Sequence, residues 1–305
     1  MMAAAKLPTS AWPEVRGRLA FDAPLARFTW FRVGGPADVL FRPADADDLS
    51  AFLAALPVET PVWPLGVGSN VIIRDGGIEG VVVLLRGPFA ASEVAGDLVI
   101  AGAGGLSANV ALKAADAGLA GLEFLSGVPG SVGGAVRMNA GAYGGEVKDV
   151  LVWADVVGRD GAVRRMTPAS LNLAYRHSDL AADAIVARAA FRGTPDAPDA
   201  VRARLRAVQA AREASQPLRT RTGGSTFRNP PGGKAWEAID AAGCRGMRMG
   251  AVHVSEKHCN FLIAEEGATA ADIEALGEAV RRQVRERTGV MLDWEIKRVG
   301  RALGQ

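Results

Sequence analysis

Two different spacings of hydrophobic residues alternate along this chain, and together they predict a mixed α+β protein. In the segment DADDLSAFLAAL the apolar residues fall on one helical face, and acidic residues occupy the first turn. The same spacing returns over 270–287, between a capping-box pair, Thr269 and Asp272, and Gly289. Two further helices are expected in VRARLRAVQAARE and around 235–242.

Short apolar runs separated by turn residues predict the strands. The segment TPVWPLGVGSNVIIRDGGIEGVVVLL is expected to form three strands around two glycine turns, and DLVIAGAGG and IVARAAF predict one strand each. Residues 150–166 predict a hairpin with Asp160 and Gly161 in its turn. Strands are also expected on both sides of the turn in TWFRVGGPADVLFRPAD and over 290–300. Residues 1–20 are expected to form a loose or weakly helical lead-in.

Three glycine-rich turns follow predicted elements: GVGSN at 66–70, GAGGLS at 102–107 and GSVGGA at 130–135. Unhindered backbone N–H groups in such turns form a nest for phosphate oxygens. The simpler interpretation of any one of them is chain reversal. GAGGLS nearly matches the dinucleotide fingerprint, but Ser107 replaces its last glycine and no βαβ unit frames it. Three such turns together favour a ligand that carries a pyrophosphate.

Ser107 has a second interpretation, because it is also expected to cap a helix that ends before Gly118. The longer stretch GSVGGAVRMNAGAYGGE, residues 130–146, is predicted not to be a good helix, because glycine loses too much conformational entropy there. It is also too apolar for a solvated linker. We therefore expect it to form an irregular wall against a ligand.

Composition restricts the class of protein without naming a function. The chain is 49% hydrophobic and 22% charged, which indicates a globular protein of about two domains, and its net charge of +2 does not indicate a nucleic-acid partner. The longest strongly apolar run, Val81–Leu85, is too short to span a membrane, and the N-terminal residues lack the apolar stretch of a signal peptide. Two cysteines, Cys244 and Cys259, suit a reducing compartment, so a cytoplasmic protein is expected. Three histidines without paired spacing predict no metal site.

Seven segments occur in the order found in one enzyme family. They are FTWFRVGGPAD, PLGVGSNVIIRDGGIEGVVV, LSGVPGSVGGAVRMNAGAYGGE, LAYRHSDL, GGSTFRNP, SEKHCNFLI and LDWEIKRVG. Each is weak alone, but the ordered set covers nearly the whole chain from about residue 20. On these motifs the chain resembles the UDP-N-acetylenolpyruvoylglucosamine reductases, also called UDP-N-acetylmuramate dehydrogenases. The short interval between Arg176 and Ser225 resembles the type II branch of that family.

The resemblance implies an α+β fold with a two-lobed FAD-binding domain of the vanillyl-alcohol-oxidase/PCMH-like type and a C-terminal α+β substrate-binding domain. The implied divisions are a lead-in at 1–20, one lobe at 21–88, a second lobe at 89–194, and a substrate-binding domain at 198–305 whose last strand returns to the active site. The shift in composition at TPDAPD marks the expected boundary before the last domain.

FAD and NADPH are the cofactor and co-substrate that the resemblance implies. The residues expected to bind FAD are Gly66, Val67, Gly68, Ser69, Asn70, Gly130, Ser131, Gly133, Gly134, Ala135, Asn139, Gly141, Ala142 and Tyr143. The flavin oxidases that share this fold often attach FAD through a histidine or cysteine near such turns. Neither residue occurs before His177, so non-covalent FAD is expected.

Three residues are expected to be catalytic. A guanidinium offers a planar fork of donors that suits a carboxylate. Most arginines form surface ion pairs. The resemblance implies that Arg176 instead contacts the enolpyruvyl carboxylate. The resemblance makes Ser225, rather than Thr226, the proton donor to C2. The commoner role of a serine is a hydrogen bond to the backbone of a turn. Glu295 matches the family's glutamate, and either a protonated carboxyl that bonds the substrate or an ionised one that orients the arginine is compatible with the sequence.

The surroundings of these residues depart from the family pattern in places. Trp294 stands where proline is commoner, and Lys297 stands where arginine is usual, which puts any bidentate contact there in doubt. Asn229, Lys234 and His258 are the residues expected to contact the substrate. Cys259 replaces alanine and is expected to be a small buried residue.

The implied reaction is reduction of UDP-N-acetylglucosamine enolpyruvate to UDP-N-acetylmuramate, with hydride passing from NADPH through flavin N5 to C3. That reaction supplies a cytoplasmic precursor of peptidoglycan. Two alternatives remain open at this point, namely a flavin oxidase of the same fold and a non-catalytic sensor of sugar nucleotides. A monomer without nucleic-acid or membrane partners is expected.

Overall fold

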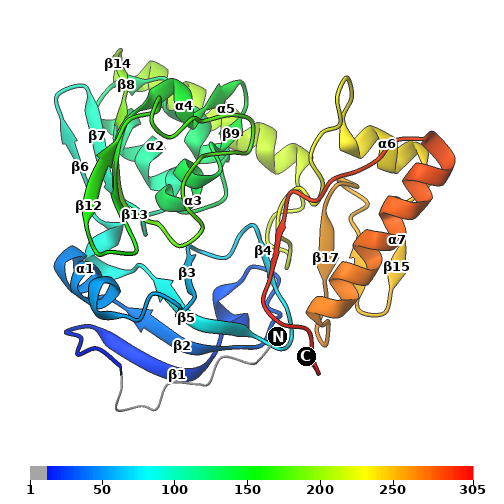
Figure 1. Cartoon of the computed structure of the whole chain (residues 1–305). Helices are drawn as coiled ribbons and strands as arrows, with labels where there is room; N and C mark the ends of the chain where they lie inside the picture. The colour runs from blue at the N-terminus through cyan, green and yellow to red at the C-terminus, as the bar shows by residue number, and fades with distance from the viewer. Residues whose placement is uncertain (1–11, 305) are drawn as a thin grey trace. The chain divides into compact units, whose positions relative to one another are not determined.

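The computed structural model, drawn in Figure 1, describes residues 12–304, and the chain divides into two compact units. Unit 1 consists of Met1–Ala23, Ala37–Gly66 and Gly80–Ala210, and unit 2 of Pro24–Pro36, Val67–Glu79 and Ala211–Gln305. The first eleven residues of the expected lead-in lie outside the described part. Strand β1 (Arg18–Pro24) begins within the rest of that lead-in, so its last residues are extended and not irregular.

The first sheet of unit 1 has the strand order β1-β2-β5-β3. Its other strands are β2 (Pro36–Arg42), β5 (Ile78–Leu84) and β3 (Val62–Leu65), and β3 runs parallel to β5. Helix α1 (Ala46–Ala55) confirms the helix expected there: Asp45 caps it, and Phe52 packs on Phe41 of β2 with ring centres 4.1 Å apart. The apolar spacing of α1 therefore matches the face that it buries.

The second sheet of unit 1 has the order β12-β11-β13-β7-β6, and helices α2 and α3 contact its central strands on one face (Figure 1). Its strands and helices are β6 (Ser92–Ala95), β7 (Leu98–Gly102), α2 (Ser107–Asp116), α3 (Val132–Arg137), β11 (Leu151–Val157), β12 (Val163–Met166) and β13 (Ile185–Arg192). The hairpin predicted at Asp160 and Gly161 is confirmed, since β11 and β12 pair antiparallel and Gly161 has φ +74°. The predicted capping role of Ser107 is wrong. Leu106 is the N-cap of α2, and the buried Ser107 hydroxyl has no hydrogen-bond partner among the described residues.

A short helix, α3, occupies part of the glycine-rich stretch 130–146, which corrects the prediction that this stretch is not helical. Ser131 is its N-cap, and its hydroxyl accepts the Gly134 N–H at 3.4 Å. Val132, Ala135 and Val136 are buried on the inner side of the helix. Tertiary burial of these three side chains outweighs the helix penalty of the two glycines between them.

Unit 2 contains a three-stranded antiparallel sheet, a parallel strand pair and two helices. The sheet is β15 (Arg248–Met249), β16 (Val252–Val254) and β17 (Leu262–Ala264), and the pair is β4 (Val71–Ile73) with β18 (Lys297–Val299). Helix α7 (Ala270–Thr288) packs on the sheet, and α6 (Ala235–Ala241) packs on α7. The remaining elements of the chain are η2 (Ala26–Phe28), η3 (Gly87–Ala90), β8 (Leu119–Ala120), η4 (Glu123–Gly127), β9 (Gly141–Ala142), β10 (Gly145–Glu146), α4 (Val147–Val150), β14 (Thr194–Pro195) and α5 (Pro198–Ser215).

Two of the expected strands are shorter than predicted, and both misses fall in unit 2. Residues 290–296 form no regular strand before β18, and residues 29–35 form none before β2. Gly34 explains the second case. Its φ is +112°, and a side chain there would lie 2.5 Å from the Ile73 carbonyl oxygen, so this segment follows the neighbouring chain closely instead of extending.

Helix α7 has the local signals that the sequence predicts. Thr269 and Asp272 form the capping box, with the Asp272 N–H donating to Thr269 Oγ1 at 3.1 Å. Gly289 ends the helix in the left-handed conformation, with φ +73°. Asp75 adds a second cap, because its carboxylate accepts the N–H groups of Ala270 and Ala271 at 3.0 and 3.1 Å.

We expect Thr269→Ala to lower the free energy of unfolding by about 1 kcal/mol, because the side-chain acceptor of the Asp272 N–H is lost while the Asp75 cap remains. Urea unfolding monitored by circular dichroism measures this change. Thr269→Ser keeps the hydroxyl and serves as the control. An equal loss in the serine variant would show that the hydroxyl does not stabilise the helix.

No helix in the described part of the chain is long and apolar enough to cross a membrane. Among residues 12–304, no group of three or more histidine, cysteine, aspartate or glutamate side chains could hold a metal ion.

Candidate active site

The turn at 66–70 offers backbone donors to a ligand. Among the described residues, none accepts a hydrogen bond from the N–H groups of Val67, Gly68, Ser69 or Asn70. Gly68 has φ +66°, and a side chain there would lie 2.3 Å from the Phe28 carbonyl oxygen. Consecutive unpaired N–H groups on a turn that only glycine can adopt fit the oxygens of a pyrophosphate.

The other two glycine segments, 102–107 and 130–135, pair with each other in unit 1. Val132 and Gly133 donate their N–H groups to the carbonyls of Gly105 and Ala103 at 2.8 and 2.9 Å. A side chain at Gly133 would lie 3.0 Å from the Ala103 Cβ. Gly133 therefore serves close contact between two backbone segments, and its N–H group is already used.

Gly66 and Ser131, both expected at the cofactor, lie against each other in unit 1. A Cβ at Gly66 would be 2.4 Å from the Ser131 hydroxyl oxygen, and the Gly66 carbonyl accepts a hydrogen bond from Arg86 at 3.4 Å. Gly66 thus packs directly against the start of α3, and this close contact leaves no room for a side chain at position 66.

Asn139 is buried, has φ +40°, and uses its side chain within the protein. Its amide nitrogen donates to Glu146 Oε2 at 2.9 Å and to the Ala174 carbonyl at 3.0 Å, and its amide oxygen accepts the Lys148 N–H at 2.8 Å. The next expected residues, Gly141 and Ala142, form strand β9, and the half-exposed Tyr143 follows them with φ +50°. The Asn139 side chain therefore shapes this loop, and its amide group is used within the protein.

Arg176 belongs to a tight turn that Asn139 holds against the same loop. Ala174 and His177 bridge across the turn, Arg176 has φ +54°, and Arg176 Nη2 donates to the Gly141 carbonyl at 3.2 Å. Within unit 1 the structure thus brings the expected carboxylate-binding arginine to the loop expected at the cofactor. The nearby Glu146 has a lowered pKa, chiefly because Lys148 donates to it, with smaller contributions from Asn139 and the charge of Arg176 and with burial opposing.

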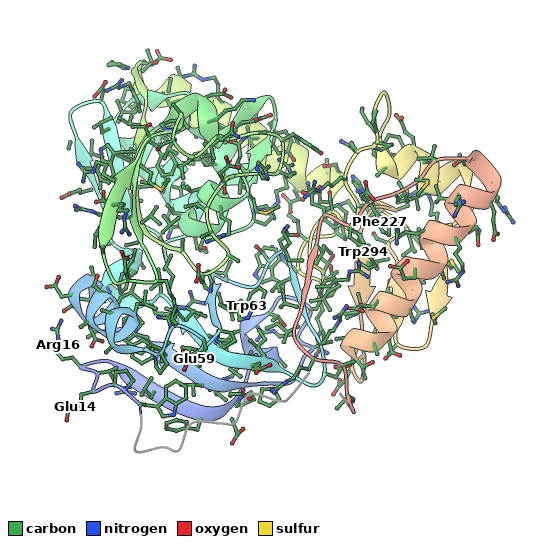
Figure 2. The ribbon with its side chains drawn as sticks, in the orientation of Figure 1. Glu14, Arg16, Glu59, Trp63, Phe227 and Trp294 are labelled. Carbon is green, nitrogen blue, oxygen red and sulfur yellow. The ribbon has the colours of Figure 1, made fainter. Side chains whose placement is uncertain are left out.

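The segments that carry Ser225 and Glu295 lie side by side in unit 2. The Thr226 carbonyl accepts the Glu295 N–H at 2.8 Å, and Phe227 pairs with Trp294, with ring centres 5.2 Å apart (Figure 2). Glu295 lies between this bridge and β18, not within the strand that the sequence predicts. The two expected catalytic residues of unit 2 are therefore on adjacent backbone segments.

Asn70 connects the glycine turn to the Glu295 segment. Its amide nitrogen donates to the Glu295 carbonyl at 3.4 Å, and its carbonyl accepts the Lys297 N–H at 3.2 Å. Lys297 itself is exposed, and the next residue, Arg298, donates to Glu278 at 3.1 Å. The turn at 66–70 is thus part of the same structure as the expected catalytic glutamate.

Asn229, Lys234 and His258 gather around the start of α6. Asn229 Oδ1 accepts the Ala235 N–H at 3.1 Å, and Lys234 is the N-cap residue of that helix. The His258 ring lies edge-on to Phe261 and Trp236, with ring centres 4.7 and 6.5 Å away. Burial, assisted by the charge of Arg245, lowers the pKa of His258, which favours the neutral ring.

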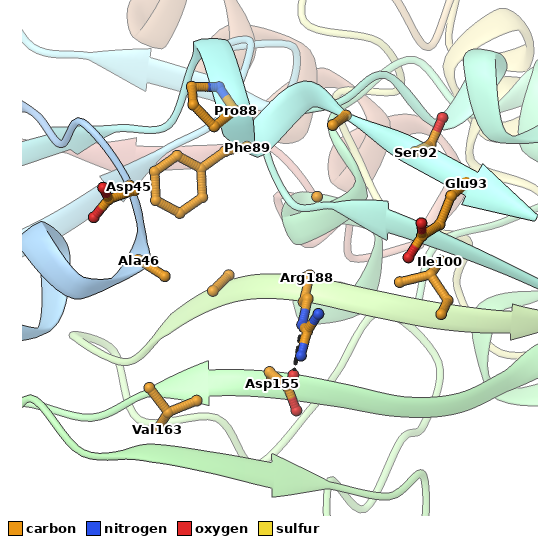
Figure 3. A pocket seen from close by; sticks show the side chains of 13 residues that line it. Asp45, Ala46, Pro88, Phe89, Ser92, Glu93, Ile100, Asp155, Val163 and Arg188 are labelled. Carbon is orange, nitrogen blue, oxygen red and sulfur yellow. Dashed lines mark hydrogen bonds and ion pairs between the residues drawn. The ribbon is translucent and has the colours of Figure 1, made fainter.

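A pocket of about 560 Å³ in unit 1 is separate from all these residues (Figure 3). Arg188 Nε donates to Asp155 Oδ2 at 2.8 Å on its wall, and Arg165 binds the same carboxylate. The hydrogen bond from Arg165, with help from Arg188 and against burial, lowers the pKa of Asp155. None of the lining residues, all of them described, is one expected at the cofactor or the substrate. We assign the pocket no part in the reaction.

Sequence reasoning missed two residues that hold the active-site segments, Asn260 and Glu278. Asn260 binds the backbone next to Ser225, and Glu278 binds Trp294 next to Glu295. Asn260 lies within a family-like motif, HCNF, which was the available signal. Cys259 in that motif is buried as expected, and both cysteines are free thiols.

Two protein-family models match this sequence. Residues 37–167 match the family model of an FAD binding domain, so the chain is a flavoprotein with FAD as its cofactor, in keeping with the unpaired turn at 66–70. Residues 216–299 match the model of the C-terminal domain of UDP-N-acetylenolpyruvoylglucosamine reductase. The chain belongs to the UDP-N-acetylenolpyruvoylglucosamine reductase family of oxidoreductases, as the following relatives show.

The relatives bearing that name cover nearly the whole chain. The enzyme of Acidiphilium cryptum is 62% identical over 95% of this chain and 94% of its own length. That of Gluconobacter oxydans is 58% identical over 94% of each. The crystal structure of the reductase from Thermus caldophilus superposes with a TM-score of 0.81 at 34% identity, covering 94% of this chain and all of that one. The expected α+β fold, with an FAD-binding part and a C-terminal domain of this family, is confirmed.

Proposed function

We propose that this protein reduces UDP-N-acetylglucosamine enolpyruvate to UDP-N-acetylmuramate, with NADPH as the reductant, in the cytoplasmic synthesis of peptidoglycan precursors. Family membership supports the FAD-dependent reaction. The observation that carries the assignment of residues is the hydrogen bond from the Glu295 N–H to the Thr226 carbonyl, because it keeps the serine and glutamate segments together. Two buried free thiols agree with a reducing compartment.

The residues present fit FAD. The N–H groups at 67–70, which have no acceptor among the described residues, would bind its pyrophosphate. The other residues assigned to it are Gly130, Gly133, Gly134, Ala135, Gly141, Ala142 and Tyr143, through their backbone or small side chains. Bound FAD supplies the hydride transfer, and the protein supplies binding, orientation and electrostatics.

Arg176 and Glu295 are assigned to the carboxylate of the enolpyruvyl group. An isolated vinyl ether resists hydride attack, and negative charge develops toward the carboxylate as C3 is reduced. A guanidinium that pairs with this carboxylate stabilises that charge more in the transition state than in the ground state. The Gly141 carbonyl accepts a hydrogen bond from Nη2 at one edge of the guanidinium and orients it.

Ser225 is assigned to deliver the proton to C2. A serine hydroxyl is a weak acid, so its contribution depends on its position and on the electrostatics around it. Asn229, Lys234 and His258 are assigned to the sugar-nucleotide part of the substrate. Neutral His258 offers an Nε2–H donor, because its Nδ1 accepts the Asn260 N–H at 3.3 Å.

The purified protein tests this function directly. Flavin absorbance should accompany it without covalent attachment, and NADPH oxidation should depend on the enolpyruvyl sugar nucleotide and yield UDP-N-acetylmuramate. Loss of the flavin on denaturation tests the non-covalent state. Turnover of an alcohol with oxygen, and none with the enolpyruvyl nucleotide, would instead indicate a flavin oxidase. Bound flavin without any substrate-dependent turnover would indicate a sensor.

Arg176→Lys should lower kcat/KM for the enolpyruvyl nucleotide by about 10- to 50-fold, because lysine keeps the charge but not the planar fork. Flavin reduction by NADPH should change little. Arg192→Lys is the matched control, since Arg192 pairs with Asp97 on the surface. Equal rates in the two lysine variants would exclude Arg176 from carboxylate binding.

A further inference from the structure

Ser225 lies in a loop that has little regular structure to hold it. Residues 221–230 form no helix or strand, and isolated bridges join Ser225 to Phe261 and Phe227 to Trp294. The neighbouring hydroxyl does not stabilise the loop, since buried Thr226 Oγ1 has no hydrogen-bond partner among the described residues. The Glu295 N–H binds the Thr226 carbonyl, and a second residue holds the other backbone groups next to Ser225.

Asn260 provides that fixation. Its side-chain oxygen accepts the Phe227 N–H at 3.0 Å, and its side-chain nitrogen donates to the Phe227 carbonyl at 2.8 Å. Its own carbonyl accepts the Thr226 N–H at 2.7 Å. A side-chain amide carries one N–H donor and one carbonyl acceptor, as a backbone peptide group does. The Asn260 amide therefore pairs with both backbone groups of Phe227 in the way that a neighbouring strand would.

Burial makes these bonds hard to replace. Asn260 is 4% exposed, Phe227 is 1% exposed and Thr226 is fully buried. A donor or acceptor of this backbone that lost its partner would have no bulk water to bond, so the loop would shift to regain one. A shift of about 1 Å in a reacting group can cost about 100-fold in rate.

The segment that carries Asn260 is itself closed by short-range bonds. The Asn260 N–H donates to His258 Nδ1 at 3.3 Å, and the Phe261 N–H donates to the His258 carbonyl at 2.9 Å. The Ser255 N–H binds the Phe261 carbonyl at 2.8 Å. Asn260 therefore projects its amide from a defined turn.

We propose that Asn260 is a positioning residue for the proton donor, and that it sets the orientation of Ser225 by holding Phe227 with its side-chain amide while its backbone carbonyl holds Thr226. This inference rests on the proposed function. Asn260 contacts neither substrate nor cofactor in this role. It acts only on the step in which the substrate is protonated.

The Asn260→Asp variant is the sharpest test, because it has the same shape but lacks the donor. At pH 8 its carboxylate faces the Phe227 carbonyl, and oxidation of reduced FAD by the enolpyruvyl nucleotide should slow by about 100-fold. Flavin reduction by NADPH should stay within about twofold. As the pH falls, the buried carboxyl takes up a proton, donates to that carbonyl as the amide did, and the rate should recover. The wild-type rate should show no such gain at low pH.

Stopped-flow absorbance of the flavin measures both half-reactions between pH 5.5 and 8. Asn109→Asp, at an exposed position on α2, is the control for an added carboxylate. Asn260→Ser removes both bonds without adding charge and should show the same loss without recovery at low pH, which keeps the test informative if the aspartate variant folds poorly. The positioning role would be overturned if either variant slowed both half-reactions equally or left the oxidation rate unchanged. It would also be overturned if the rate of Asn260→Asp did not recover at low pH. If wild-type protein does not oxidise its reduced flavin with this nucleotide, the proposed function fails instead.

Discussion

Replacing Ser225 with alanine is expected to slow the oxidation of reduced FAD by the enolpyruvyl nucleotide by about 10²- to 10⁴-fold. The reason is that C2 would lose its proton donor, so the negative charge that hydride transfer to C3 develops would be stabilised by the proposed carboxylate contacts but not removed by protonation. Flavin reduction by NADPH involves no such proton and should keep nearly its full rate. Stopped-flow absorbance separates the two half-reactions.

Thr226→Val is the comparison that makes this prediction specific. Thr226 is the adjacent hydroxyl residue, it is fully buried, and its hydroxyl has no partner among the described residues. Valine has the same shape, so the oxidation rate should be kept, and stability should not fall. If valine at 226 abolished oxidation and alanine at 225 did not, the proton donor would be Thr226. If Ser225→Ala slowed both half-reactions equally, the serine would not be a proton donor.

Gly277→Ala is expected to lower the free energy of unfolding by about 2–3 kcal/mol, although alanine is normally the better helix former by about 1 kcal/mol. Gly277 lies inside α7, and a Cβ there would be 2.2 and 2.3 Å from two ring atoms of Trp294. The ring cannot move away easily. Trp294 Nε1 donates to Glu278 at 2.8 Å, and Arg298 lies over the ring at 4.5 Å.

The companion experiment is a double-mutant cycle. Trp294→Leu should be destabilising alone, but in its background Gly277→Ala should cost little, because the clash is gone. Denaturant unfolding of the flavin-loaded protein gives the four free energies. If the two changes in the free energy of unfolding were additive, a clash between the alanine and the Trp294 ring would not be the cause of the destabilisation.

The same contact lies next to a residue that is proposed to be catalytic. Trp294 precedes Glu295, and Glu278 receives hydrogen bonds from Trp294, Arg281 and Arg298. Although burial opposes it, these bonds and the two arginine charges lower the pKa of Glu278, so it remains a carboxylate that can bind them. Trp294 is thus held in place by a glycine and a glutamate on α7.

Local signals were enough for much of the fold. Helix α7 was predictable because its capping box, apolar face and terminal glycine are all contained within one stretch of about twenty residues. The hairpin at Asp160 and Gly161 was predictable for the same reason. Helix α3 was not, because its glycines oppose helix formation and only burial of its inner side chains outweighs them.

The candidate site divides in the same way. Motif order in the sequence was sufficient to nominate Ser225 and Glu295, and the glycine turn at 66–70 was recognisable as a nest. The sequence could not show that Val132 and Gly133 donate their N–H groups to a neighbouring segment, or that the Asn139 amide forms its hydrogen bonds within the protein. Those facts depend on which distant backbone groups meet.

By itself, then, the sequence determined the fold class, the family and the chemical types of residue at the site, because periodicity, caps and motifs act over short stretches. Only the tertiary structure decided how those residues are held. Asn70 and Glu295 meet although they are 225 positions apart, and Asn260 clamps the Ser225 loop from 33 positions beyond Phe227. Such contacts form because buried polar backbone groups must find partners, and the partner that is available depends on the folded chain and not on the neighbouring sequence.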